Sequence, residues 1–597
     1  MNIEARISSK VQKALVRLYN TEMSADKIQI QRTRKDFTGD FTVVVFPFLR
    51  FSKKPPEQTG EEIGNFLKDR VDEVSDFNVI KGFLNLTIDN AFWLRFLNSM
   101  HQRGHIYDLH LDPGNQKVVV EYSSPNTNKP LHLGHIRNNL LGFSISRILE
   151  ATGHQVKKVN LVNDRGIHIC KSMLAWKKWG NGETPVDRGV KGDHLVGDYY
   201  VMFDREHKKQ VAYLMEMGKT KEEAEKEEPL MKEARELLSL WEQDDPDTVE
   251  LWKKMNGWVL EGFEQTYHDL GIDFDRVYYE SEVYKLGKEE VKKGLEKGVF
   301  FRKNDGSVWA DLSDEDLDEK LLLRGDGTSV YITQDIGTAI QRYREFDFDE
   351  HIYVVGNEQN YHFQVLKIVL GKLDYSWAEH LHHLAYGMVE LPEGKMKSRE
   401  GTVVDADDLV GEMLTTAEEM TRESGKIGDF PEEEKKRIYR AIGLGALKYF
   451  ILKVDPKKNM TFDPGESVDF NGNTGPFIQY SYARINSLLS KAKDKNIDVP
   501  DELSGHVPLN NKEIQLVKLI HQFPSVIGEA AQEMNPAVVA NFLYELAREF
   551  NQFYHDHSVL GAGNQQTIQL RLVLSVQVSK VIREAMWLLG IDLPERM

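Results

Sequence analysis

Cysteine is almost absent from this chain of 597 residues, in which Cys170 is the only one. A single cysteine excludes an intramolecular disulfide and a zinc site built from thiolates. Long apolar runs are also missing, because none reaches the roughly 18 residues that a membrane-spanning helix requires. The N-terminus lacks the apolar core of a signal peptide and has the spacing of an amphipathic helix. These absences favour a cytoplasmic protein with no membrane partner.

Positive charge is also in deficit, since the net charge is −18. Such a balance argues against a broad nucleic-acid-binding surface. The deficit is concentrated in the middle of the chain. Residues 1–110 carry 16 Lys and Arg against 14 Asp and Glu, and residues 474–597 carry 11 against 13. Either end can therefore carry a local basic face.

A strand, a helix and a second strand are predicted in succession after residue 116. KVVVEYS (117–123) has the apolar character of a buried strand, and VKKVNLV (156–162) is the next one. Apolar residues recur at helical spacing between them, and Gly153 suits the end of that helix. This order predicts an α/β fold with a doubly wound, Rossmann-type parallel sheet. Further strands or strand ends are expected at VYITQDIG (330–337) and HIYVVG (351–356).

The length suggests three to five domains at roughly 100–200 residues each. Near the N-terminus, a helix at 60–71 is expected between strands at 41–49 and 82–88. Asp112-Pro113-Gly114 is a turn signal that marks the first boundary. The predicted domains are an α+β N-terminal domain (1–112), the parallel-sheet domain (113–372) with a charged helical insertion at about 180–260, a helical connecting region (373–455) and an all-α C-terminal domain (456–597).

The segment His132-Leu133-Gly134-His135 stands at the start of the helix that follows the first strand. A helix N-terminus has free N–H groups and a partial positive charge, so it binds phosphate. The imidazoles of His132 and His135 add hydrogen-bond donors, and Gly134 lets a nucleotide approach the backbone. A polar helix start without function is the alternative, because such a short motif occurs by chance. The strand–loop–helix context favours an ATP site.

A basic loop, GKMKSREGTVV (394–404), is the second candidate element. Its functional candidates are Lys395, Lys397, Ser398 and Arg399. Such a loop can close over a triphosphate and stabilise the charge on departing pyrophosphate. Taken alone, this segment is better interpreted as a basic surface loop. The segment His132-Leu133-Gly134-His135, called HLGH below, favours the functional interpretation instead. Together the two elements predict an enzyme that activates a carboxylate as an adenylate, with Mg²⁺ arriving on ATP and no protein-bound metal.

These two elements resemble the HIGH and KMSKS signatures of class I aminoacyl-tRNA synthetases. The wider sequence resembles the arginyl-tRNA synthetases in particular, over nearly the whole chain. The matching stretches are VEYSSPNTNKPLHLGHIRNN (120–139), NDRGIH (163–168), DGTSVYITQDIG (326–337), VVGNEQNYHFQVLKIV (354–369) and NTGPFIQYSYARINSLL (473–489). The resemblance implies a monomeric arginine–tRNA ligase whose substrates are L-arginine, ATP and tRNA(Arg). It also implies that tRNA binds before the adenylate forms, that the N-terminal domain contacts tRNA and that the C-terminal domain binds the anticodon.

The basic loop departs from the family signature in two places. Lys397 stands where KMSKS has its central serine, and Arg399 replaces the second lysine. Arginine keeps the positive charge but not the compact ammonium. Family members that lack this lysine are thought to compensate with a lysine upstream of HIGH, and Lys129 matches that position.

Arginine selection requires a carboxylate for the guanidinium and a flat aromatic neighbour. Tyr331 and Asp335 are four residues apart and share a face on a helical turn. A capping acid and a core aromatic are the alternatives for these two residues. By resemblance, the arginine-binding residues are Glu121, Ser124, Asn126, Tyr331, Asp335 and Gln359, of which Asn126 and Gln359 hold the α-ammonium and carboxylate. Glu358 could serve in place of its neighbour Gln359.

The adenine and tRNA contacts are less sharply indicated. In class I synthetases the backbone that precedes the basic loop abuts adenine, which points to Met388, although a core position is the alternative. Candidate tRNA-binding residues are Tyr480, Tyr482, Tyr554, Trp587, Arg32 and Arg34. Aromatic side chains can stack unpaired bases, but at helical spacing they are more often core residues. The two arginines belong to a small basic cluster that could equally be a solvated loop.

Three other functions compete with this one. A cysteinyl enzyme needs a cysteine-rich zinc site, and a class I lysyl enzyme lacks the Tyr331 and Asp335 pattern. A small-molecule adenylyltransferase shares HxGH but is shorter and has no large helical domain. A catalytically inactive paralogue would be favoured only by Arg399, against an intact HLGH.

Overall fold

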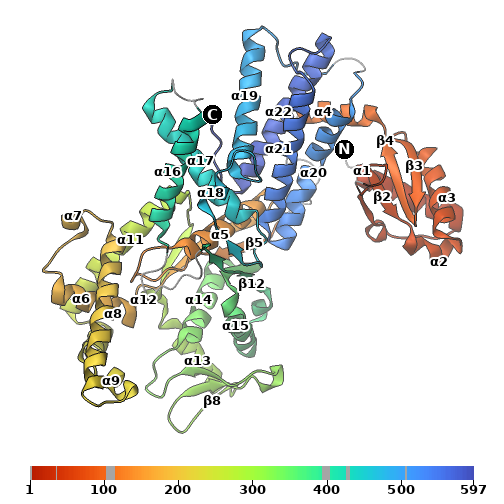
Figure 1. Ribbon diagram of the computed structural model, residues 1–597. Coiled ribbons are helices and arrows are strands. Elements are labelled where there is room, and N and C mark those ends of the chain that lie inside the picture. The colour runs from red at the N-terminus through yellow and green to blue at the C-terminus, as the bar shows by residue number, and fades with distance from the viewer. Residues whose placement is uncertain (1–2, 35, 103–113, 393–403, 425–429, 504–506) are drawn as a thin grey trace.

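The computed structural model describes residues 3–34, 36–102, 114–392, 404–424, 430–503 and 507–597. In Figure 1 the N-terminal domain, in red, stands beside the blue C-terminal helices, and the yellow insertion helices lie on the opposite side of the molecule. Within the described residues, no helix is both long enough and apolar enough to cross a membrane.

The N-terminal domain is built on an antiparallel sheet with strand order β1-β2-β4-β3. The strand predicted over 41–49 ends early, because Pro47 lies in a one-turn helix at Phe46–Phe48 and has no N–H to donate. The elements are α1 (Ile3–Tyr19), β1 (Ile30–Arg32), β2 (Phe41–Val44), α2 (Leu49–Ser52), α3 (Pro56–Lys68), β3 (Val74–Ile80), β4 (Phe83–Ile88) and α4 (Asn90–Gln102).

A five-stranded sheet with the order β12-β11-β5-β6-β7 forms the centre of the chain. Every neighbouring pair in it is parallel, which confirms the predicted sheet type. The strands are β5 (Lys117–Glu121), β6 (Gln155–Val162), β7 (Arg276–Tyr279), β11 (Glu350–Gly356) and β12 (Leu381–Tyr386). Helix α5 (Leu133–Ala151) connects β5 to β6 as expected, and Gly153 follows it with φ +90°.

The valine run of β5 is explained by burial on both faces of the sheet. Val118 and Val120 belong to the core that contains Ile136 of α5. Val119 points to the other face and belongs to the core that contains Ile336 of α14 (Tyr331–Phe346) and residues of α15 (Asn360–Lys372). Helices on both faces make this a doubly wound sheet.

The expectation of a strand or strand end over 330–337 was wrong, because these residues begin helix α14. Ile332, Ile336 and Ile340 are buried at intervals of four residues, which is helical spacing. A short apolar segment such as the one around Tyr331 fits a strand and a buried helix equally well. The companion expectation for 351–356 is confirmed as part of β11.

The predicted helical insertion is present between β6 and β7. Its elements are α6 (Ile167–Trp179), α7 (Pro185–Arg188), α8 (Gly192–Glu216), α9 (Lys221–Glu227), α10 (Pro229–Glu242) and α11 (Pro246–Leu270). Between β7 and α14, two helices and an unpredicted antiparallel sheet follow: α12 (Glu280–Val283), α13 (Leu286–Glu296), β8 (Phe300–Arg302), β9 (Val308–Ala310) and β10 (Lys320–Leu323).

The last third of the described chain is helical apart from one two-stranded pairing. Its elements are β13 (Val389–Glu390), α16 (Ala406–Ser424), α17 (Glu432–Leu452), β14 (Met460–Thr461), α18 (Pro464–Ser467), α19 (Gly475–Asp494), α20 (Asn511–Glu533), α21 (Pro536–Asp556) and α22 (Gln565–Leu588). The N-terminal domain packs on these helices through α4, where the His521 ring lies 4.9 Å from Phe96 and 5.6 Å from Trp93. The N-terminal domain and the C-terminal helices are therefore in direct contact, and Figure 1 shows them side by side.

Candidate functional site

The two histidines of HLGH fix each other at the start of α5. His132 is the N-cap residue, and its Nδ1 accepts a hydrogen bond from the Gly134 N–H at 3.1 Å. His135 Nδ1 accepts from the His132 N–H at 3.2 Å. Since both Nδ1 atoms accept, each neutral ring carries its hydrogen on Nε2. Both rings can thus donate a hydrogen bond to a phosphate at the helix N-terminus.

Burial keeps both imidazoles neutral near pH 7. Desolvation, helped by the Lys129 ammonium, lowers the pKa of His132 to about 4. Desolvation and the two neighbours His132 and Lys129 hold the pKa of His135 well below its usual value. Burial also lowers the pKa of Lys129. The pair therefore acts as hydrogen-bond donors without adding charge.

The HLGH segment is paired through its backbone with the residues that follow the basic loop. The Leu133 N–H donates to Val404 O at 3.1 Å, and the Ala406 N–H donates to Leu131 O at 3.0 Å. His132 and Asp405 form an antiparallel bridge. The predicted functional residues of the loop, Lys395, Lys397, Ser398 and Arg399, lie outside the described residues. The described part nevertheless brings the downstream end of that loop onto HLGH, as a joint ATP site requires.

A cavity of about 250 Å³ adjoins the upstream side of HLGH. Lys129 and His132 line one wall, His194 and Tyr200 of α8 line another, and Asp405 closes it. The predicted compensating lysine therefore lies beside the first histidine of the motif. Helix α8 of the insertion contributes to the same cavity, a contact that no local pattern indicates.

Arg137, one turn into α5, positions the backbone at Met388. Its buried guanidinium donates to Met388 O at 2.9 Å, to Lys458 O at 2.7 Å and to Pro456 O at 3.2 Å. The Met388 side chain is 40% exposed, so the core alternative for this residue is wrong. Its contact with adenine stays a prediction. Sequence reasoning missed Arg137, because its partners lie more than 250 residues downstream.

The loop after β5 is held in a strained conformation. Ser123 and Ser124 have φ values of 77° and 46°, in the left-handed region that non-glycine residues rarely adopt. Buried amides compensate, since Asn138 Oδ1 accepts from the Ser123 N–H at 2.5 Å and Asn160 Oδ1 accepts from the Ser124 N–H at 3.0 Å. The loop that leads to the exposed Asn126 is therefore fixed before any ligand binds.

Glu121, a predicted arginine ligand, has partners within the protein. Its carboxylate forms a buried ion pair with Arg342 of α14 and accepts a hydrogen bond from Ser124 Oγ at 2.9 Å. The Arg342 guanidinium lies above the Tyr278 ring at 4.9 Å. Much of the hydrogen-bonding capacity of the Glu121 carboxylate is therefore used within the protein, where it joins β5 to α14. A direct contact with the substrate stays a prediction.

Asp335 and Tyr331 lie on the first turns of α14. Tyr331 is 72% exposed, so the alternative of a core aromatic is wrong. Asp335 is partly exposed and its Oδ2 is 2.6 Å from His362 Nε2 on the first turn of α15. Gln359 is exposed at the N-cap of the same helix. The structure thus brings Tyr331, Asp335 and Gln359 to adjoining helix N-termini, at the carboxyl edge of the sheet where ligands of such folds bind.

Glu280 is a buried carboxyl that sequence reasoning missed. It is the first residue after β7, and a carboxyl end of a parallel strand was the signal that could have drawn attention to it. Burial raises its pKa to about 7, and the charges of Asp164 and Asp335 act in the same direction. Arg165 and a hydrogen bond with Gln334 oppose that rise. The charge of Asp335 therefore reaches Glu280, with burial as the main cause of the shift in its pKa.

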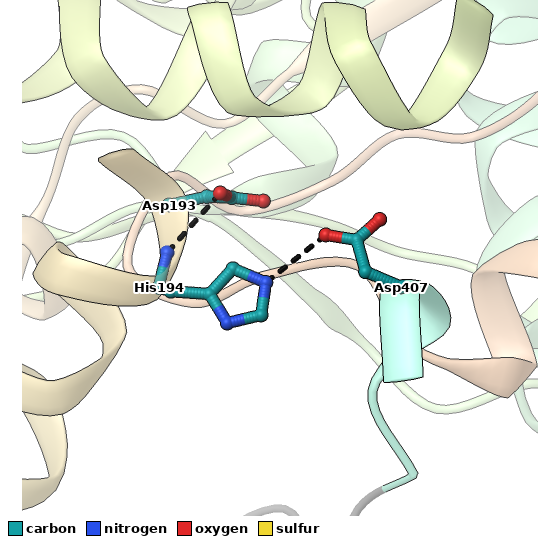
Figure 2. Close-up of side chains that lie close together, drawn as sticks. All are labelled: Asp193, His194 and Asp407. Atoms are coloured by element: carbon teal, nitrogen blue, oxygen red, sulfur yellow. Dashed lines mark hydrogen bonds and ion pairs between the residues drawn. The ribbon is translucent and has the colours of Figure 1, made fainter. Parts of the chain in front are cut away.

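Asp193, His194 and Asp407 form a cluster whose ligand atoms could surround a metal ion, as Figure 2 shows. The ammonium of Lys191 already occupies the position that a metal cation would take among these carboxylates. Its ammonium lies 2.6 Å from Asp407 Oδ2, 2.6 Å from Thr266 Oγ1 and 3.7 Å from Asp193 Oδ2. His194 Nε2 lies 3.0 Å from the same Asp407 oxygen. We therefore interpret this cluster as a salt-bridge junction between α8 and α16.

The predicted tRNA-binding aromatics are all at least partly exposed. Tyr480 of α19 and Tyr554 of α21 are partly exposed, and the Arg484 guanidinium lies 4.8 Å and 5.3 Å from their ring centres. Tyr482 and Tyr554 both pack partly against the core, as the alternative of core residues expects. Trp587 is 44% exposed at the end of α22, with the Arg147 guanidinium 4.6 Å above its ring.

The two N-terminal arginines lie where that domain faces α20. The Arg32 Nη2 donates to Lys518 O at 3.0 Å. Arg32 and the exposed Arg34 both line a cavity of about 600 Å³ whose opposite wall includes Gln522 and Glu549. The alternative of an isolated solvated loop therefore does not hold for Arg32.

Three family models match consecutive parts of the chain. The model described as arginyl tRNA synthetase N terminal domain matches residues 2–88. The model described as tRNA synthetases class I (R), catalytic domain matches residues 100–463. The model described as DALR anticodon binding domain matches residues 478–597.

Individual proteins are similar over the full length. The chain is 57% identical to an arginine–tRNA ligase of Bacteroides fragilis and 54% identical to one of Porphyromonas gingivalis, with 100% of each chain covered in both comparisons. Among solved structures, the arginyl-tRNA synthetase of Thermus thermophilus has a TM-score of 0.77 at 24% identity, covering 100% of both chains. That of Plasmodium falciparum has the same TM-score at 19% identity, covering 100% of this chain and 99% of its own. These two structural likenesses concern the fold.

Proposed function

Because the chain belongs to the class I arginyl-tRNA synthetases and is an arginine–tRNA ligase, we propose that residues 121–135 and the first turns of α14 and α15 carry its first reaction. In that step ATP and arginine form arginyl-adenylate and pyrophosphate. The arginine carboxylate attacks the α-phosphate, so the protein needs no nucleophile of its own. Its contribution is positioning and charge stabilisation.

The ATP side of the site is assigned to HLGH and the basic loop. His132 and His135 donate from Nε2 to phosphate oxygens, and the backbone at Gly134 gives the phosphates close access. Met388, held through its carbonyl by Arg137, borders adenine. Mg²⁺ enters with ATP and is held mainly by phosphate oxygens. Cationic support for pyrophosphate comes from Lys129, Lys395, Lys397 and Arg399, with Ser398 as a further hydrogen-bond donor.

The arginine side is assigned to Asp335 as the guanidinium partner, with Tyr331 as the aromatic neighbour. Glu280 adds a second negative charge to this pocket. Asn126 and Gln359 hold the α-ammonium and carboxylate, while Glu121 and Ser124 keep the loop between them in place. A guanidinium binds best to a carboxylate that accepts two parallel hydrogen bonds, and Asp335 keeps lone pairs on both oxygens beyond its single contact with His362.

The second reaction transfers arginine to the 3′ end of tRNA(Arg). The 2′-hydroxyl of the terminal ribose attacks the acyl carbon and AMP leaves. Tyr480, Tyr554 and Arg484 offer a stacking surface for anticodon bases, with Tyr482 and Trp587 at its margins. Arg32 and Arg34 contact the tRNA backbone from the N-terminal domain. The enzyme acts as a cytoplasmic monomer that must bind tRNA before the adenylate forms.

The observation that carries the arginine assignment is the partly exposed Asp335 on the first turns of α14, beside Tyr331 and the buried Glu280. The test is Asp335→Asn, which keeps the shape and removes the charge. We expect its KM for arginine to rise by a factor of about 100, equivalent to about 3 kcal/mol, because the guanidinium loses its ion pair. The KM for ATP should change less than twofold. An unchanged KM for arginine in steady-state aminoacylation would remove Asp335 from the pocket.

A further inference from the structure

His362 has no role in the proposed reactions, yet its side chain contacts Asp335, the proposed partner of the guanidinium. His362 lies on the first turn of α15, and Asp335 lies on the first turns of α14. The His362 Nε2 and the Asp335 Oδ2 are 2.6 Å apart, a short distance for a hydrogen bond of this type. An ionised carboxylate can only accept, so the hydrogen lies on Nε2.

This contact restrains the carboxylate that is meant to receive the guanidinium. Two parallel hydrogen bonds require the carboxylate plane to match the plane of the guanidinium. The aspartate χ2 torsion is broad, so a carboxylate without a partner samples many planes. A donor on one lone pair of Oδ2 limits that freedom and leaves Oδ1 and the second lone pair of Oδ2 to accept from a guanidinium.

The surroundings of His362 keep its ring in place. The side chain is 19% exposed, and its ring meets the Phe363 ring edge-on at 5.6 Å. It also follows Gln359, the proposed ligand of the substrate backbone, by three residues. The start of α15 therefore reaches both ends of the proposed arginine position.

We infer that His362 is a positioning residue for arginine recognition, which holds the Asp335 carboxylate in the plane that the guanidinium requires. This inference rests on the proposed role of Asp335. It concerns the binding of arginine alone, since His362 makes none of the contacts proposed for ATP. The same contact therefore predicts a selective change in one kinetic constant.

The test compares two amides at position 362. A glutamine places its amide nitrogen near the position of Nε2, whereas an asparagine places it near Nδ1, out of reach of Asp335. Steady-state aminoacylation should give His362→Asn a KM for arginine raised about tenfold, the usual cost of losing a hydrogen bond to a charged group. His362→Gln should stay within about threefold of the wild type. Neither variant should change kcat or the KM for ATP by more than twofold, and the exposed His380→Ala serves as a control.

The outcomes separate this inference from the assignment of Asp335. If Asp335→Asn raises the KM for arginine but His362→Asn does not, the positioning role is wrong and the pocket stands. If Asp335→Asn leaves that KM unchanged, the pocket itself is wrong. Equal increases for arginine and ATP in His362→Asn, or no difference between the asparagine and glutamine variants, would indicate a general packing role and overturn the inference. The double variant Asp335→Asn/His362→Asn should be no worse than Asp335→Asn alone, because both changes act on one contact.

Discussion

Single residues at this site are tuned by burial more than by charged partners. His132 and His135 are kept neutral by desolvation, so they can donate to phosphate without repelling Lys129. Glu280 is shifted in the opposite sense, because burial opposes its negative charge and raises its pKa to about 7. The two histidines are therefore insensitive to pH near neutrality, while Glu280 titrates there.

This contrast predicts different pH profiles for the two substrates. Glu280 is protonated below about pH 7 and negative above it, so the KM for arginine should fall several-fold between pH 6 and pH 8. Arginine itself keeps its charges over that range. The KM for ATP should stay flat, because the pKa of His132 is about 4. Glu280→Gln should give a high KM for arginine that no longer depends on pH. A profile in Glu280→Gln with the wild-type slope would show that another group is responsible.

At the scale of elements, the sequence was informative where one segment carries its own signal. Helix α5, its HLGH start and the parallel strands β5 and β6 could be predicted from spacing and local context. Contacts between distant segments could not. His194 and Asp407 are 213 residues apart, and Glu121 and Arg342 are 221 apart, so no local pattern connects them. The error over 330–337 has another cause: a short apolar segment fits a strand and a helix equally well until its partners are known.

The salt-bridge junction between α8 and α16 is the clearest of these distant contacts. The bond to Asp407 raises the pKa of His194 to about 9, and burial opposes that rise. At Asp407, burial acts to raise the pKa, but the hydrogen bonds from His194 and Lys191 outweigh it and lower the pKa to about 2. The groups that face His194 are Asp193, Asp405 and Asp407, and Lys191 shares Asp407 with it. The contribution of His194 to stability is complete below its unfolded pKa of 6.5 and is lost as the pH rises through 9.

Asp407→Asn should therefore lower stability by an amount that depends on pH. We expect a loss of about 2 kcal/mol between pH 5 and pH 7, seen as a lower thermal midpoint, because charge-assisted hydrogen bonds are lost. The difference from the wild type should shrink above pH 9, where His194 is neutral, and only the part due to Lys191 should remain. Asp408→Asn, at an exposed neighbouring position, is the matched control. An Asp407→Asn deficit that is constant from pH 6 to pH 10 would contradict this account of the junction.

At the scale of the whole molecule, the helical parts are tied to the chemical site. Arg137 of α5 binds carbonyls at Met388, Pro456 and Lys458, just before the C-terminal helices. The same α5 meets α22, where Ser144 Oγ donates to Leu588 O at 2.9 Å. The N-terminal domain in turn rests on α20. If tRNA contacts both terminal domains as proposed, it acts on helices that contact α5, and this would give a physical route by which tRNA controls the first reaction.

We propose that this chain activates arginine only when tRNA(Arg) is bound. ATP–pyrophosphate exchange measures that activation and should be run with each amino acid in turn, with and without tRNA(Arg). We expect exchange with arginine plus tRNA(Arg) and at least a hundredfold less in every other combination, roughly 3 kcal/mol of coupling. Exchange at the same rate with arginine but without tRNA would rule out the tRNA requirement. Exchange with a different amino acid, or no exchange with any amino acid, would rule out the function itself.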